Sequence, residues 1–441
     1  MNCDFARTLL IPYIKQGLSD DQKTQVEEHL AGCADCRAEL AAAKGLLERT
    51  EDASSADIIK LSHEIIERGV DAGASDIHLE PQSDNSLLVR YRIDGVLHEV
   101  KTISAMQRDA VTRRIKLMAE LNLMETKKPQ DGRIPIRLKE RDFDLRVSVV
   151  PFIFGEGMVM RILDRGVSIP NLEDLALQPD TLARLTKLSK QPMGLILISG
   201  PTGSGKTTVA YSLLKRLVSS ECKVLSIEDP VEMIIPGVNQ VHLHKPDTTF
   251  ASALRAFLRH DPDVIFVGES RDAEMMTLTC QAAMTGHLVL STCHADDAVG
   301  SLKRYCEAVD ERFTVVEATV GVSAQRLARL VCQNCREPMP YDSASPSLRF
   351  FGITERDANS GNLTKGKGCE VCHSTGYRGR TPIMEVIELT PEINRAIIDQ
   401  VDWDRIREIA RNQGFQSMKD AARERILEGK TTPEEAFRLF G

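Results

Sequence analysis

One eight-residue run constrains the fold of this chain more than any other feature. It reads Gly200-Pro201-Thr202-Gly203-Ser204-Gly205-Lys206-Thr207, matches G-x4-G-K-[ST], and directly follows the apolar segment 195–199. Glycines allow backbone N–H groups to wrap around β- and γ-phosphates, and a helix that begins here points its positive end at the anion. The run therefore predicts a strand, a nucleotide-binding loop and a helix, with the Lys206 charge on the phosphates and the Thr207 hydroxyl on Mg²⁺. Thr208 completes the candidate nucleotide-binding set.

Short apolar runs predict the sheet that carries this loop. They cover residues 195–199, 224–227, 264–267 and 288–291, and segments with helical patterns separate them. Continuous apolar strands are typical of a parallel sheet that is covered on both faces. The predicted class is an α/β nucleotide-binding domain.

Polar side chains at the ends of these strands are the catalytic candidates. Glu269 follows the run 264–267, and Glu228 begins an acidic cluster after another strand. Either residue alone reads as a solvated turn, but beside a phosphate loop we expect Glu269 to polarise the attacking water or act through metal-bound water. His287 and His294 bracket a further strand, and His294 lies where a γ-phosphate sensor would be. The alternative for each histidine is a hydrogen-bonding core residue.

Seven of the eleven cysteines fall into two groups. Cys332, Cys335, Cys369 and Cys372 form two CxxC pairs with 33 residues between them. Two CxxC turns can close a tetrahedral structural zinc site; four buried thiols are the alternative. The remaining cysteines, Cys222, Cys280, Cys293 and Cys306, read as core thiols.

The second group lies near the N-terminus. His29, Cys33 and Cys36 follow or end a predicted helix at about residues 20–31, and Cys3 is the nearest candidate for a fourth ligand. This segment resembles the small zinc-binding modules at the front of zinc-containing anti-sigma factors. A metal-free helical hairpin is the alternative.

We call the N-terminal module of residues 1–48 the head. Between the head and the nucleotide-binding domain, the sequence pattern predicts an α+β block. A polar linker at 49–57 precedes an amphipathic helix at 58–69, strands within 75–100, a helix near 105–121 and a strand pair. The expected domains are 1–48, 58–168 and 169–441, the last with a zinc element at 332–372. This agrees with about three domains for 441 residues.

Composition narrows the function classes. The net charge of −8 argues mildly against a protein that coats nucleic acid. We find no long apolar run and no signal-peptide pattern, so we expect a cytoplasmic protein with at most peripheral membrane contact. A reducing compartment favours thiols and metal ligands over disulfides.

Ordered motifs then support a family resemblance. They include ASDIHLEP, PQDGR, DLRVS and VMRILD, followed by GPTGSGKTT, IEDPVE, LRAFLRHDPDVIFVGE, AAMTGHLVLST, AQRLARLVC and CEVCHSTGYRGR. From about Ser54 onward the chain resembles the ATPases that drive type II secretion and type IV pilus assembly. The resemblance implies a RecA-like ATPase domain behind a PAS-like domain, assembled as a homo-hexamer that acts on an inner-membrane platform protein.

The resemblance also implies roles for individual residues. Glu269 matches the Walker B carboxylate, and Glu228 lies in the acidic box. Arginines in the motifs would neutralise charge that develops on the γ-phosphate. These are Arg146, Arg161, Arg255, Arg259 and Arg271, for which surface salt bridges are the bland alternative. The tetracysteine element favours an assembly or secretion motor over a retraction motor.

The chain departs from the family pattern in four places. Ser270 replaces an apolar residue, Gly157 replaces a basic one, and the histidine box reads STCHADD. The zinc-type head stands where these motors carry a longer docking domain, so its partner is unknown. Two competing hypotheses are a regulatory zinc protein with a vestigial ATPase body and, less favoured because of the charge, a nucleic-acid translocase.

Overall fold

We describe the chain from a computed structural model. The described residues are Cys3, Ala6, Leu9, Tyr13, 18–41, 55–164, 166, 168–243 and 249–441, so most of the predicted linker lies outside them. The chain divides into two compact units, Met1–Val167 and Ser168–Gly441, and each is described by itself.

The head is helical where it is described. Helix α2 (Asp20–Gly32) begins at Ser19, whose side chain forms a capping box with Gln22, and residues 34–41 are also helical. Ala6, Val26, Leu30 and Cys36 are the buried residues of a small apolar cluster. The helix predicted at about 20–31 is confirmed.

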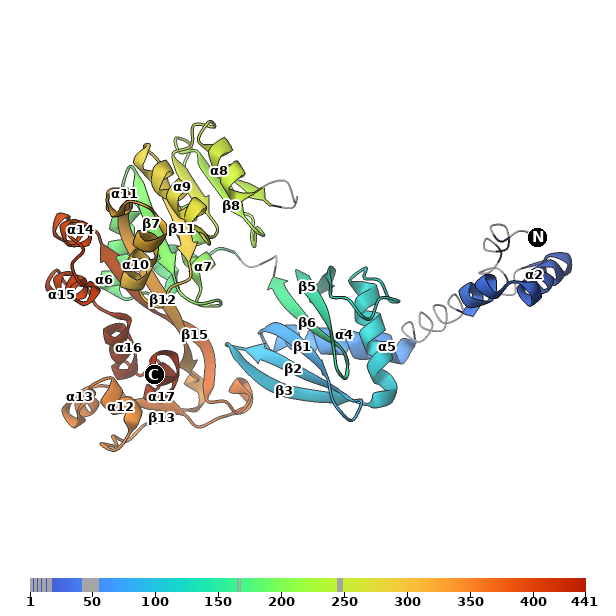
Figure 1. The fold of residues 1–441 in the computed structure, drawn as a ribbon. Coiled ribbons are helices and arrows are strands. Elements are labelled where there is room, and N and C mark those ends of the chain that lie inside the picture. Colours follow the sequence, from blue (N-terminus) through green and yellow to red (C-terminus); the bar gives the residue numbers. More distant parts are fainter. Residues whose placement is uncertain are drawn as a thin grey trace. The chain divides into compact units, whose positions relative to one another are not determined.

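A six-stranded antiparallel sheet with two helices forms the rest of the first unit (Figure 1). The strand order is β3-β2-β1-β6-β5-β4. Apolar side chains alternate along β5, where Phe143, Leu145, Val147 and Val149 are buried in one cluster with residues of both helices. The elements are α4 (Ala56–Asp71), β1 (Ala74–Pro81), β2 (Leu87–Ile93), β3 (Val96–Ile103), α5 (Ala105–Met118), β4 (Gln130–Leu138), β5 (Arg141–Phe152) and β6 (Gly155–Asp164).

The second unit contains a seven-stranded sheet of order β15-β12-β7-β11-β10-β8-β9 (Figure 1). All neighbours pair in parallel except β12 and β15, which are antiparallel. This confirms the predicted α/β class and the four predicted strands. The strands are β7 (Gly194–Ser199), β8 (Val224–Glu228), β9 (Val238–His242), β10 (Val264–Val267), β11 (Leu288–Cys293), β12 (Thr319–Val331) and β15 (Tyr377–Glu388).

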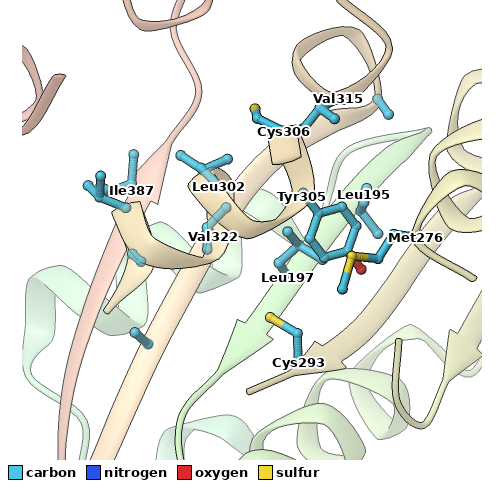
Figure 2. Close-up of a cluster of buried hydrophobic side chains, with 14 of the residues drawn as sticks. Leu195, Leu197, Met276, Cys293, Leu302, Tyr305, Cys306, Val315, Val322 and Ile387 are labelled. Atoms are coloured by element: carbon cyan, nitrogen blue, oxygen red, sulfur yellow. The ribbon is translucent and has the colours of Figure 1, made fainter. Parts of the chain in front are cut away.

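Helices cover both faces of this sheet. Along β7, Leu195 and Leu197 belong to one buried cluster, whereas Ile196 and Ile198 belong to another on the opposite face. Figure 2 shows the first cluster, in which Leu197 lies near Tyr305. The covering helices are α6 (Pro179–Leu188), α7 (Lys206–Leu217), α8 (Phe250–Phe257), α9 (Ala273–Met284), α10 (Ala298–Ala308) and α11 (Arg312–Ala318), with the short η1 (Leu172–Leu175) beside α7.

The pair β12 and β15 extends beyond β7 and carries the cysteine element. Between these strands the chain forms η2 (Gln333–Cys335), β13 (Arg336–Pro338), α12 (Pro346–Phe350), α13 (Glu355–Ser360), β14 (Thr364–Gly366) and η3 (Glu370–Cys372). Four helices follow: α14 (Pro391–Ile398), α15 (Trp403–Asn412), α16 (Met418–Leu427) and α17 (Pro433–Phe440). Within the described residues, none of the helices combines the length and apolar character that a membrane crossing requires.

Candidate nucleotide and metal sites

The phosphate loop joins β7 to α7 as the sequence predicts. Gly200, Gly203 and Gly205 have φ values of 143°, 77° and 88°, which side chains rarely adopt. A Cβ on Gly200 would lie 2.5 Å from the Gln325 carbonyl oxygen, so only glycine fits at this point. Gln325 also donates from Nε2 to the Ser204 carbonyl at 2.7 Å. Residue Gln325 of β12 therefore packs against the phosphate loop and holds it by a hydrogen bond.

Lys206 is folded back on the loop. Its Nζ donates to the carbonyl oxygens of Gly200 at 2.8 Å and Pro201 at 3.0 Å. Burial lowers the pKa of Lys206, and the Glu269 carboxylate opposes this shift. The ammonium thus lies in a partly buried site beside a carboxylate, where a phosphate would gain more from its charge than in water.

Three of the predicted residues meet at the carboxyl edge of the parallel strands. Glu269 Oε1 lies 3.1 Å from His294 Nε2, and Arg271 Nε donates to Glu269 Oε2 at 2.8 Å. The Glu269 side chain is 19% exposed, whereas those of His294 and Arg271 are 44% and 66% exposed. Glu269 follows β10 and His294 follows β11, and these strands are neighbours. Parallel pairing explains why residues far apart in sequence share this edge.

The departure at Ser270 has a structural explanation. Its hydroxyl is buried and lies 2.8 Å from the Ser291 hydroxyl, and its backbone N–H donates to the Thr292 carbonyl at 2.9 Å. This serine therefore joins the ends of β10 and β11 by polar contacts, where an apolar residue would join them by packing alone.

Glu228 is enclosed by hydrogen bonds. Its carboxylate accepts from the Tyr211 hydroxyl, from Ser226 Oγ at 2.6 Å and from Gln240 Nε2 at 3.1 Å, and the residue is 3% exposed. Burial raises the pKa of Tyr211, and the neighbouring Glu228 carboxylate raises it further. This arrangement ties α7 to β8 and β9, which favours a positioning role.

His287 and two of the arginines have local partners. His287 Nδ1 lies 2.9 Å from the Ala282 carbonyl at the end of α9, on the sheet edge opposite His294. Arg255 Nη2 donates to Glu274 at 2.7 Å, and Arg259 donates to the Arg255 carbonyl at 3.0 Å. Among the described contacts, neither arginine reaches Glu269, and both are exposed at one end of α8.

The other two predicted arginines lie in a cross-strand row in the first unit. Arg133, Arg146, Arg161, Asp76 and Arg92 are register partners on β4, β5, β6, β1 and β2. Like charges directly opposite each other destabilise a sheet, and carboxylates of the same sheet offset this row, since Arg133 forms an ion pair with Asp144 and Arg92 lies 3.9 Å from Asp76. Arg161 Nε donates to the buried Asp76 carboxylate at 2.9 Å.

The C-terminal cysteines form a compact cluster. The Sγ atoms of Cys332 and Cys369 lie 3.9 Å apart, those of Cys335 and Cys372 3.8 Å, and those of Cys369 and Cys372 3.7 Å. Tetrahedral zinc with bonds of about 2.3 Å places its sulfurs about 3.8 Å apart. Asn334 donates to Cys369 at 3.3 Å and lowers the pKa of that thiol, which favours the thiolate that a metal binds. The residues therefore fit a closed metal site.

The N-terminal set also converges. Cys3 and Cys33 have Sγ atoms 3.8 Å apart, His29 Nε2 lies 3.3 Å from Cys36 Sγ, and the four ligand atoms all lie within 4.8 Å of one another. The backbone and side-chain contacts of Cys36 lower the pKa of Cys33. Three thiols and an imidazole are a donor set that suits zinc.

Sequence reasoning missed three residues of these sites. Gln325, Asp76 and Arg133 each lie in a quoted motif, AQRLARLVC, ASDIHLEP or PQDGR, which was the available signal. Their contacts depend on strand register, which the motifs alone do not contain.

Comparisons with known proteins agree with this geometry. Residues 51–438 match the family model "Type II/IV secretion system protein", and residues 3–37 match "Putative zinc-finger". The type IV pilus assembly ATPase PilB of Thermus thermophilus is 41% identical over 86% of this chain and 42% of its own length. The type II secretion system protein E of Pseudomonas aeruginosa is 39% identical over 94% of this chain and 82% of its own.

Solved structures show the same fold. The ATPase DotB of Legionella pneumophila aligns with a TM-score of 0.62 at 20% identity, over 85% of this chain and 94% of that one. The pilus retraction motor PilT with bound ADP aligns with a TM-score of 0.56 at 24% identity, over 85% and 96%.

Proposed function

The chain belongs to the type II/IV secretion system protein family, and from this membership we propose that it is an ATP-hydrolysing motor for type IV pilus assembly or type II secretion. One observation carries the proposal. Glu269, His294 and Arg271 meet at the sheet edge that also presents the phosphate loop and Lys206. A carboxylate beside a phosphate-binding lysine is what ATP hydrolysis requires.

Each residue has a role in this mechanism. Lys206 leaves the loop carbonyls and pairs with the β- and γ-phosphates, and Thr207 offers its hydroxyl to Mg²⁺, which supplies charge neutralisation when bound. Glu269 orients the attacking water and accepts its proton. His294 contacts Glu269 and so senses whether the γ-phosphate is present.

Hydrolysis also needs positive charge near the γ-phosphate, which arginines supply in related chemistry. We propose that Arg146 and Arg161 approach the γ-phosphate as ATP binds, with Arg271, Arg255 and Arg259 as further candidates. Assembly as a homo-hexamer would let one subunit complete the site of another. An inner-membrane platform protein is the proposed load, with the motor peripheral at the cytoplasmic side. Zinc at both clusters has a structural role, because four protein ligands leave no position open.

Turnover by purified variants tests the site. We expect Lys206→Ala to weaken ATP binding and Glu269→Gln to bind ATP but hydrolyse it at least about 100-fold more slowly. Glu307→Gln is the matched control, since Glu307 is an exposed carboxylate on α10 whose nearest ion-pair partner is Lys303 at 3.9 Å. Undiminished hydrolysis in both site variants would refute the assignment.

A regulatory zinc protein is the second candidate, and the convergent cluster of Cys3, His29, Cys33 and Cys36 is the observation that favours it. This candidate requires that the full chain bind a regulator through the head and lack turnover. Hydrolysis by the wild-type chain that Lys206→Ala abolishes would remove it.

A further inference from the structure

One buried carboxylate joins two helices that lie far apart in sequence. Glu385, on β15, is 4% exposed. Its Oε1 accepts the backbone N–H of Ala298 at 2.7 Å, and its Oε2 accepts that of Met418 at 2.7 Å. These are the first residues of α10 and α16. Each oxygen thus binds an N–H that has no partner within its own helix.

The first of these helices begins directly after the histidine box. Only residues 295–297 separate His294 from Ala298, and His294 is fixed on its other side by β11. Asp297 caps α10 and also accepts from Arg407 of α15 at 2.9 Å. The backbone carbonyl of His294 accepts from Arg304 at 3.0 Å. A shift at the start of α10 therefore changes where His294 meets Glu269.

The second helix belongs to the C-terminal group that follows β15. Helix α16 has its own capping box, in which Ser417 and Asp420 each accept the backbone N–H of the other, but this box leaves the Met418 N–H without a partner. Glu385 therefore supplies the acceptor that this cap does not provide, and it does so from a buried position on β15. The result is a rigid connection between the C-terminal helices and the segment that carries His294.

We propose that Glu385 is a positioning residue for ATP turnover, which holds the His294 segment and the C-terminal helices together through one carboxylate. This inference rests on the proposed function, because the turnover that it modulates is that of Glu269 and His294. Movement of α16 then changes the His294 contact, and nucleotide at the γ-phosphate position changes α16. Glu385 itself touches no substrate.

Glu385→Gln tests the connection with little change in shape. Glutamine has one acceptor oxygen, so one of the two N–H groups loses its partner. We expect kcat to fall about tenfold with the KM for ATP within about twofold, since alignment and not binding is lost. Glu388→Gln is the matched control on the same strand, because Glu388 pairs with Lys187 and Arg184 instead.

A double-variant cycle separates positioning from general damage. If Glu385 acts through His294, Glu385→Gln should lower the kcat of a His294→Ala protein by less than about twofold. The inference would be overturned if the two substitutions lowered kcat independently, so that their effects multiplied in the double variant. It would also be overturned if Glu385→Gln alone had the kcat of the active wild-type enzyme.

Hydrogen exchange provides a readout that does not need turnover. Ser417→Ala perturbs only the α16 cap, yet we expect faster exchange at the start of α10 as well as α16, and Glu385→Gln should have the same two effects. Faster exchange at α16 alone would overturn the inference. A wild-type chain that does not hydrolyse ATP would instead refute the proposed function. The hydrogen-exchange result would still decide whether Glu385 connects α10 and α16.

Discussion

The hydrogen bond between Tyr211 and Glu228 allows a quantitative test of how the phosphate-loop helix is held. Tyr211 is fully buried, its hydroxyl donates to the Glu228 carboxylate, and the hydroxyl oxygen accepts the Glu232 N–H at 3.2 Å. Tyr211→Phe removes both bonds but keeps the ring, which packs edge-on against Phe266 with centroids 6.1 Å apart. The substitution therefore removes hydrogen bonds without leaving a cavity in the core.

The expected loss follows from the type of acceptor. A buried hydrogen bond to a charged group contributes about 1.5–3 kcal/mol, so Tyr211→Phe should lower the free energy of unfolding by about 2–3 kcal/mol. For a unit of this size that is a fall in Tm of about 4–10 °C. Thermal and urea unfolding of the full chain measure it. Tyr91→Phe is the control, since Tyr91 donates to a neutral acceptor, the Ile65 carbonyl, at 2.6 Å and should cost about 1 kcal/mol.

Turnover of the folded variants completes this test. Because Tyr211, Ser226 and Gln240 occupy the Glu228 carboxylate, we expect Glu228→Gln to reduce kcat less than about tenfold, far less than Glu269→Gln. A Tyr211→Phe protein within about 0.5 kcal/mol of wild type would refute the stability argument. A Glu228→Gln protein as inactive as Glu269→Gln would refute the positioning role and support direct catalysis.

Three further outcomes are expected. Cys372→Ser and Cys36→Ser should each remove about one zinc equivalent per chain, measured by atomic absorption, whereas equal metal content in both variants and wild type would contradict the two sites. Asp76→Asn should lower kcat by releasing Arg161 while leaving ATP binding to the isolated subunit unchanged; weaker binding would contradict this. Burial, with a smaller contribution from Asp297, raises the pKa of Glu385 to about 7 although the N–H groups of Ala298 and Met418 and the Arg407 charge oppose the shift, so the carboxylate loses an acceptor as pH falls through 7. The ratio of wild-type to Glu385→Gln kcat should therefore decrease from pH 8 to pH 6, and a ratio independent of pH would contradict the titration.

Features that depend on a few adjacent residues can be predicted from the sequence, whereas contacts between distant segments cannot. Apolar runs predicted β7, β8, β10 and β11 to within two residues, because strands buried on both faces need continuous apolar side chains. The CxxC spacing and the phosphate-loop glycines can likewise be recognised directly in the sequence. Both are properties of a few adjacent residues.

Contacts across the sheet could not be predicted from the sequence. The approach of Gln325 to Ser204 joins residues 121 apart, and that of Glu385 to Ala298 joins residues 87 apart. The enclosure of Glu228 by Tyr211 likewise depends on how α7 packs. These contacts arise from strand order and helix packing, which single-sequence periodicity does not determine.

The place of β7 in its sheet has a consequence for synthesis of the chain. Both neighbours of β7, the strands β11 and β12, are translated later, and Gln325 supports a loop that ends more than 100 residues earlier. Chains grow from the N-terminus and fold in domain-sized units as they emerge. The phosphate loop therefore leaves the ribosome well before its support exists, and the nascent chain acquires its nucleotide site only when β12 is released. A ribosome-bound chain stalled before residue 319 should bind no ATP.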